Sequence, residues 1–301
     1  MPLVSDVHVD AMLSNLSVKY RNAAYIADRV MPAIPVAHES DQYWIFGKEN
    51  FMIPETLRAP NAPAARVEWS LSDDSYTALE YALASPIGRR ERDNADDGLN
   101  LEISTTEYVT DMLLLDREVR VAGIAQDTGT FTAAEPNPNW DEAACTPVED
   151  VMAAAEAMRL AVGRRPNLMV LPAAVLYTLK SAAAIIDQVK YTSDGRVTLE
   201  LLRRLFEIDN ILVPEAQKNT AAEGETESMS DVWTDTVGLY YVSPAAQQKT
   251  VTMGHTFRAR PFRTRKWDED DTEATIVEVS MIDAEKVVCA GAGYLLNNCN
   301  A

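Results

Sequence analysis

The sequence has few cysteines and no long hydrophobic run. Its three cysteines, Cys145, Cys289 and Cys299, form no C-x-x-C pair, which excludes a disulfide framework and a zinc knuckle. The longest nearly apolar stretch, residues 287–296, is too short for a bilayer, which requires about 20 residues. Because the first residues also lack the basic segment of a signal peptide, we expect a chain kept in a cytoplasm, with no membrane partner.

Signatures of catalysis and of ligand binding are also missing. The three histidines, His8, His38 and His255, lie far apart and lack the spacing of a zinc or general-base site. The sequence contains no glycine-rich phosphate loop and no nucleophile elbow. We therefore expect no enzyme activity, no metal and no cofactor, and we interpret the acids of residues 268–271 as a solvated turn.

Cations are scarce relative to acids, and the formal net charge is -19. A protein that reads duplex DNA needs cations to displace counterions from phosphate, so that function is not expected. Residues 257–267, FRARPFRTRKW, are the exception, because basic residues alternate there with aromatics as in single-strand binders. Acids follow immediately, which favours a charged strand face turned to solvent.

The N-terminal region, residues 1–42, contains prolines at positions 2, 32 and 35. Proline fixes φ and drives the preceding residue to extended backbone, so MPAIPV at residues 31–36 predicts an extended arm. The alternative is an edge strand packed on its own domain, since this spacing specifies extension and not the packing partner.

Residues 43–85 predict a long excursion like a hairpin. Two strand-like runs, QYWIFG and RVEWSL, flank a stretch rich in proline and turn residues. A loop of this length without its own core is usually functional or a linker. Arg58 and Arg66 flank its tip, either as solvated charges or as contacts to the acids of a neighbouring molecule.

The rest of the chain alternates helices and strands. A capping box formed by Ser104 and Glu107, with apolar residues at helical spacing, predicts a helix over about residues 105–126, roughly 33 Å long. A second capping box at residues 146–149, with Pro147 at the first helical position, opens an α/β unit. A basic strand, an acidic turn and a second strand then predict a β-hairpin, and GAGYLL predicts a last strand.

Five stretches in this order resemble one known family over nearly the whole chain: YIADRVMPAIPV with DQYWIFGKENF, LEISTTEYVTDMLLLDREVRVA, RRPNLMVLPAAVLYTLK, LLRRLFEIDNILVPEAQ, and VWTDTVGLYYV. They resemble a tailed-bacteriophage major capsid protein with the Hong Kong 97 fold. The resemblance implies an α+β fold with an N-terminal arm (1–42), an extended loop (43–85), a peripheral domain with a spine helix (86–145), an axial domain (146–242) and returning strands of the peripheral domain (243–301).

The resemblance also implies a function. It is that of a coat protein of the virion capsid, which self-assembles into hexamers and pentamers of an icosahedral shell around packaged double-stranded DNA, inside the host bacterial cytoplasm. Implied partners are a portal, a decoration protein, the DNA through non-specific contacts, and a scaffolding protein that we expect to be separate. The arm and loop then pack on neighbouring subunits, and the candidates for these contacts are Arg29, Trp44, Phe46, Phe51, Arg58 and Arg66.

Two other functions stay open at this point. One is an encapsulin-like compartment shell with the same fold, and the other is a cytoplasmic α/β enzyme with a long lid and a site near residues 214–231. Some shells of this fold are cross-linked from a loop lysine to an asparagine. Lys48 is the only lysine of this loop and lies near its base, so we expect a shell without covalent cross-links.

Overall fold

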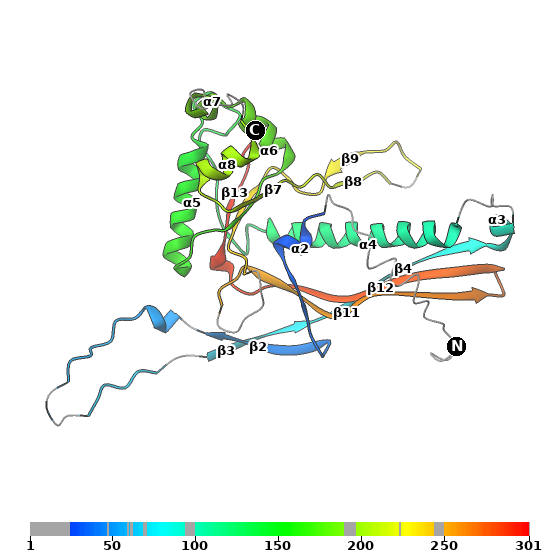
Figure 1. Ribbon diagram of the computed structural model, residues 1–301, viewed down its shortest axis with the longest axis horizontal. Helices are drawn as coiled ribbons and strands as arrows, with labels where there is room; N and C mark the ends of the chain where they lie inside the picture. Colours follow the sequence, from blue (N-terminus) through cyan, green and yellow to red (C-terminus); the bar gives the residue numbers. More distant parts are fainter. Residues whose placement is uncertain are drawn as a thin grey trace.

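The computed structural model describes residues 25–46, 48–58, 60, 63–68, 71–93, 100–189, 197–222, 224–243 and 250–300. Figure 1 shows a long helix, α4 (Leu101–Ala125), lying along a sheet, with a mixed body of helices and strands at one end of it. A thin loop between β2 (Ser40–Phe46) and β3 (Leu71–Thr77) projects away from both parts. The mixture of helices and sheets confirms the predicted α+β class.

The sheet beneath α4 has four strands in the order β1-β11-β12-β4. The predicted hairpin of the C-terminal region forms its centre, and β4 pairs antiparallel to β12. Val109 and Leu113 of α4 pack against Val279 on this sheet, so one face of the sheet is covered by the helix. The remaining bounds are β1 (Ala33–Pro35), β4 (Leu79–Gly88), the short helix α3 (Arg89–Asp93), β11 (Gly254–Glu269) and β12 (Ala274–Val287).

The sequence predicted that the basic residues of 257–267, now part of β11, face solvent. This prediction is wrong, because several of these side chains form ion pairs within the chain. Arg258 and Arg265 stand opposite Asp283 and Glu278 in the register of β11 and β12. Their ion pairs close at 2.8 Å and 2.6 Å, because opposite charges directly across a strand pair attract. Lys266 pairs with Glu102 of α4 at 2.5 Å. All three cations therefore form ion pairs within the chain.

The second body is built on a five-stranded sheet in the order β5-β13-β10-β6-β7, with helices packed against it. Two of its strands were expected elsewhere, because β5 lies in the predicted range 86–145 and β13 in the returning strands 243–301. Backbone pairing of β13 with both β5 and β10 draws them into this sheet. The bounds are β5 (Thr132–Ala134), α5 (Pro147–Val162), β6 (Leu168–Val170), α6 (Ala173–Ser181), α7 (Ala183–Val189), α8 (Leu199–Phe206), β7 (Asn210–Leu212), β10 (Val237–Tyr240), η3 (Ala290–Ala292) and β13 (Gly293–Leu296).

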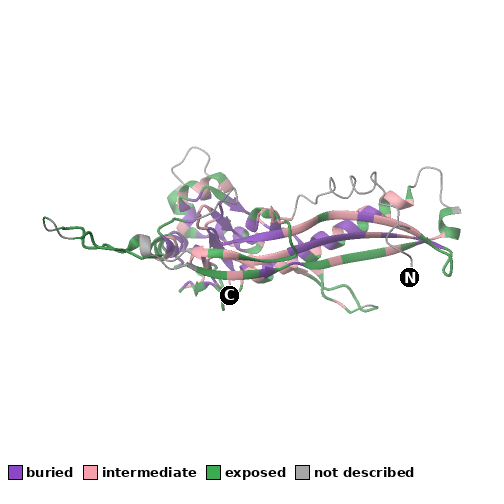
Figure 2. Cartoon of the chain, turned by 90° about the horizontal axis from the view of Figure 1, so that it is seen from below, coloured by how far each residue is buried: buried purple, intermediate pink, exposed green. Residues whose placement is uncertain are grey.

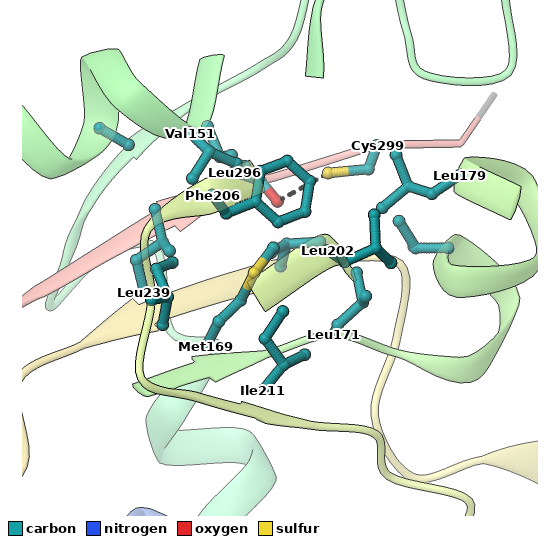
Figure 3. Close-up of a cluster of buried hydrophobic side chains, with 14 of the residues drawn as sticks. Val151, Met169, Leu171, Leu179, Leu202, Phe206, Ile211, Leu239, Leu296 and Cys299 are labelled. Atoms are coloured by element: carbon teal, nitrogen blue, oxygen red, sulfur yellow. Dashed lines mark hydrogen bonds between the residues drawn. The ribbon is translucent and has the colours of Figure 1, made fainter. Parts of the chain in front are cut away.

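The core of this body lies between the helices and the five-stranded sheet (Figure 3). Val151 of α5 and Phe206 of α8 meet the sheet residues Met169, Leu239 and Leu296, all of them buried. Strand β6, LMV, is a short apolar run between Pro166 and Pro172 and is buried at every position. Burial of apolar side chains from both layers is what holds helices and sheet together.

Helix ends follow the capping chemistry only in part. Helix α4 begins at Leu101, because the side chain of Asn100 accepts a hydrogen bond from the Ile103 N–H at 3.2 Å. The predicted start at Ser104 is therefore wrong by one turn. Helix α5 begins at Pro147 as predicted, although Thr146 makes no side-chain cap, and it ends at Gly163, which has a left-handed φ of 72°.

Two other segments differ from what their sequences predict, which is one helix for residues 172–191 and a polar loop for residues 216–231. The helix is broken into α6 and α7 at Ala182, which has extended backbone. The polar segment of residues 216–231 contains a small hairpin, β8 (Gln217–Asn219) paired with β9 (Met229–Asp231). The hydrophobic periodicity of these two segments indicates neither the break at Ala182 nor the hairpin of β8 and β9.

The described part of the arm packs on its own chain. After α2 (Ala27–Val30), strand β1 pairs parallel to β11 as an edge of the four-stranded sheet. Ile26, Ala27, Val30 and Met31 are buried in a cluster that also holds the end of α4 and residues of the five-stranded sheet. For residues 25–36 the alternative of a strand packed on its own domain is therefore confirmed, whereas residues 1–24 lie outside the described part.

This packing predicts the effect of truncating Met31, whose side chain is fully buried. Met31→Ala should lower the free energy of unfolding of the unassembled subunit by about 2–5 kcal/mol, because it leaves a cavity at the junction of both sheets. The denaturation midpoint in urea measures this loss. Arg29→Ala, on the exposed side of the same segment, should stay within about 0.5 kcal/mol of the wild type. Equal midpoints for both variants would contradict the packing.

Candidate inter-subunit surface

The tip of the extended loop is uncovered. Every described residue between Phe51 and Glu68 is exposed. Figure 2 shows this loop as the thin green trace that leaves the body. Its apolar side chains are among the most exposed of the chain, with Ile53 at 97% and Leu57 at 88%. Met52 and Val67 are exposed as well. A group of exposed large apolar side chains on one loop is typical of an interaction site.

Most of the candidates predicted from the sequence lie on this loop. Trp44 on β2 is 64% exposed. Phe51, which lies between the end of β2 and the tip of the loop, is 67% exposed. Arg58 and Arg66 are exposed along the tip, whereas Arg29 lies apart from them on α2. The side chain of Phe46 is outside the described part of the chain. Ile53, Leu57 and Val67 were not singled out, because apolar residues in a proline-rich segment follow neither a helical nor a strand period.

The root of the loop is attached firmly to the four-stranded sheet. Asp74 on β3 accepts a hydrogen bond from the Tyr43 hydroxyl at 2.9 Å and pairs with Lys286 of β12 at 3.2 Å. The hydrogen bond from Tyr43 is the main reason why the pKa of Asp74 lies below its usual value. Next to it the rings of Tyr76 and Phe257 stack at 4.4 Å. The loop therefore leaves the body from a fixed base.

The root of the arm is held by a buried carboxylate. Glu118 of α4 is fully buried and accepts hydrogen bonds from the backbone N–H groups of Ile26 and Ala27. It also accepts one from Nε1 of Trp233, at 2.7 Å. Burial raises the pKa of Glu118 above its usual value, although these three donors and the neighbouring Arg117 act in the opposite direction. One side chain thus ties together the arm, α4 and the segment that precedes β10.

The neighbouring residue, Arg117, makes a second set of contacts with the arm and the sheet. Its side chain is 2% exposed, and its guanidinium group pairs with Asp28 of α2 at 2.7 Å. Asp283 and Glu285 of β12 lie 3.8 Å away, and the hydroxyl of Thr256 on β11 accepts a hydrogen bond at 3.2 Å. Such a buried cation needs all these partners, because burial of an unpaired charge is strongly unfavourable.

The described residues contain no other site of obvious chemistry. Among them, no group of three or more His, Cys, Asp or Glu side chains is placed to hold a metal ion. None of the helices in the described part of the chain is long and apolar enough to cross a membrane. The uncovered loop on its rigid base is the principal feature left to explain. An exposed apolar loop on a folded body is typical of one class of protein, the subunits that assemble with copies of themselves or with other chains.

Comparison with known proteins identifies that assembly. No family model matches the chain. The chain is 30% identical to the major capsid protein of Burkholderia phage BcepMu, over 97% of both chains. It is 27% identical to the major capsid protein of Pseudomonas phage JBD67, over 81% of this chain and 80% of that relative. The chain belongs to the family of phage major capsid proteins.

Solved structures agree with this assignment. A phage-related protein from Bordetella bronchiseptica RB50 aligns with a TM-score of 0.77 and 25% identity, over 97% of this chain and 98% of that one. The capsid of cyanophage P-SCSP1u aligns with a TM-score of 0.60 at 12% identity, over 98% and 92% of the two chains. The fold is the Hong Kong 97 type that the resemblance implied.

The raised pKa of Glu118 predicts a pH dependence. In the window between the usual glutamate pKa, about 4.3, and the higher pKa in the folded state, the folded chain binds more protons than the unfolded chain. The contribution of Glu118 to stability therefore falls as pH rises through this window. The unfolding free energy of the wild type minus that of Glu118→Gln should decrease from about pH 4 upward.

Urea denaturation of the unassembled subunit at a series of pH values measures this difference. Glu215→Gln removes the same charge at an exposed position and serves as the control, for which we expect no such trend. A difference for Glu118→Gln that stays flat, or that rises with pH, would contradict the effect of burial on this carboxyl.

Proposed function

We propose that this chain is the coat protein that forms hexamers and pentamers of an icosahedral shell around packaged double-stranded DNA. The observation that carries the proposal is the uncovered apolar surface of the extended loop, from Phe51 to Val67. Membership in the phage major capsid family supplies the kind of assembly. Full burial of a side chain such as Ile53 or Leu57 against a neighbour contributes about 1.5–3 kcal/mol, and a shell repeats each contact in every subunit.

In this proposal the loop reaches over a neighbouring subunit of the same capsomer. Trp44, Phe51, Arg58 and Arg66 contact that neighbour, with Phe46 and Arg29 as further contacts. The body with the five-stranded sheet is the axial domain at the centre of the capsomer, and the four-stranded sheet with α4 is the peripheral domain. The division of the chain near residues 42, 85, 145 and 242 is kept as a proposal, with β5 and β13 assigned to the axial sheet.

The family relationship implies a structural role and a place in the virion capsid. We propose in addition that the chain has no catalytic activity and is assembled in the host bacterial cytoplasm. The further partners are a portal, a separate scaffolding protein, a decoration protein and the packaged DNA, which it contacts non-specifically. A net charge of -19 favours weak contacts with DNA, because a strongly acidic chain repels phosphate.

The two other functions fit less well. A compartment shell has the same fold, but the two relatives found by sequence comparison are both phage coat proteins. An enzyme with a lid near residues 214–231 would need reactive groups beside that segment. Its described part, 214–222 and 224–231, contains instead the hairpin of β8 and β9, which is closed by hydrogen bonds such as that from Gln217 to Asp231.

The double variant Ile53→Asp with Leu57→Asp tests the proposed function. Two charges placed in the apolar contact should prevent assembly, because a buried unpaired carboxylate is strongly unfavourable. Both positions are exposed in the subunit, so its melting temperature should not change. Electron microscopy and sedimentation should find capsomers or shells for the wild type and single subunits for the variant.

The conservative pair Ile53→Leu with Leu57→Met is the control, and it should assemble like the wild type. A wild-type protein that stays monomeric at every salt and protein concentration would refute the coat function. Normal shells from the aspartate variant would remove the loop from the interface.

Charge reversal tests the two arginines of the loop. Arg58→Glu with Arg66→Glu should weaken assembly, since acids outnumber cations on this chain and offer the natural partners. Each exposed pair is worth only about 0–1 kcal/mol, so the effect arises by repetition in the shell. Light scattering during assembly should show a larger defect at low salt, where screening is weakest. Salt-independent, normal assembly of the double variant would exclude these contacts.

A further inference from the structure

The base of the extended loop has a second attachment, to helix α5. Nζ of Lys48, in the short helix η2 (Lys48–Phe51), donates a hydrogen bond to the backbone carbonyl of Ala161 at 2.8 Å. Ala161 lies in the last turn of α5, where carbonyls have no partner within the helix and the helix dipole favours a cation. Lys48 is therefore well suited to this position.

The ring of Phe51 completes this attachment. Gly163, which ends α5 with a φ of 72°, lies so close that a Cβ at this position would stand 3.1 Å from the ring. Glycine meets two requirements at position 163, because it adopts the left-handed conformation and leaves room for the ring of Phe51. Phe51 is still 67% exposed, so much of its ring remains available to another molecule.

The two attachments lie on different parts of the molecule. Tyr43 and Asp74 bind the ribbon of β2 and β3 to the four-stranded sheet, whereas Lys48 and Phe51 bind its end to the second body. A ribbon held at a single point pivots about that point, and a second point removes that freedom. The described residues beyond Phe51, as far as residue 68, are exposed. The second attachment thus restricts the direction in which the loop leaves the body.

We propose that Lys48 is a positioning residue for assembly. Its hydrogen bond to the Ala161 carbonyl aims the extended loop, and so sets the angle at which the apolar tip meets a second copy of this chain. The proposal rests on the proposed function and adds to it the residue that controls the geometry of the contact. The ammonium group acts through the loop that it orients, within its own subunit, and is not itself part of the interface.

The test compares Lys48→Met, which keeps the length of the side chain but loses the donor, with Lys48→Arg, which keeps a donor. Lys180→Met is the matched control, since it removes the same charge from an exposed position on α6. All three variants should melt like the wild type. In the unassembled subunit, hydrogen exchange of residues 48–51 should be faster in Lys48→Met alone, while that of β3 stays unchanged.

Electron microscopy of assembled material gives the second measurement. We expect Lys48→Met to lose closed shells of uniform diameter in favour of open or irregular particles, and Lys48→Arg and Lys180→Met to retain them. Uniform shells and unchanged exchange in Lys48→Met would overturn the proposal. Failure of Lys48→Arg together with Lys48→Met would overturn the role of the donated hydrogen bond. If the wild type forms no shell, the proposed function fails, and the exchange measurement alone decides whether Lys48 fixes the loop.

Discussion

Two adjacent residues of opposite charge on α4, Arg117 and Glu118, fix the parts of this molecule relative to one another. Both are buried, yet they bind different partners. Glu118 accepts hydrogen bonds from the arm and from Trp233, and Arg117 reaches the arm and the two central strands of the four-stranded sheet. Removing either charge leaves that residue's own buried partners without compensation, so the arm, helix and both sheets are coupled at this point.

This coupling is reinforced by apolar packing at the junction of the arm, α4 and the five-stranded sheet. The buried cluster at the junction takes side chains from the arm, from the end of α4 and from the five-stranded sheet, including Val30, Val121 and Tyr240. The hydroxyl of Tyr240 also donates to the carbonyl of Ala125 at 2.6 Å, which satisfies a group at the end of α4. The loop, in contrast, keeps Ile53 and Leu57 almost fully exposed.

Much of the fold was predictable where one element depends on its own residues. The spacing of apolar residues revealed α4, Pro147 marked the start of α5, and the basic and acidic runs marked the hairpin of β11 and β12. The candidate surface was predictable in outline, because the length and proline content of residues 43–85 indicate a loop without its own core. Ile53 and Leu57, the most exposed of its apolar side chains, have no periodic pattern that distinguishes them from core residues.

The sequence by itself determined the class of the fold, the positions of most helices and strands, and the presence of a long loop without its own core, because propensity, capping and proline geometry act over a few residues. The tertiary structure alone decided that β1 and Met31 belong to the core, that β5 and β13 join the second sheet, and that Glu118 and Lys48 hold the arm and the loop. These outcomes depend on contacts between residues far apart in the chain, such as the 113 positions between Lys48 and Ala161. Nothing in the local sequence of either residue specifies its partner, since pairing is set by the packing that brings them together.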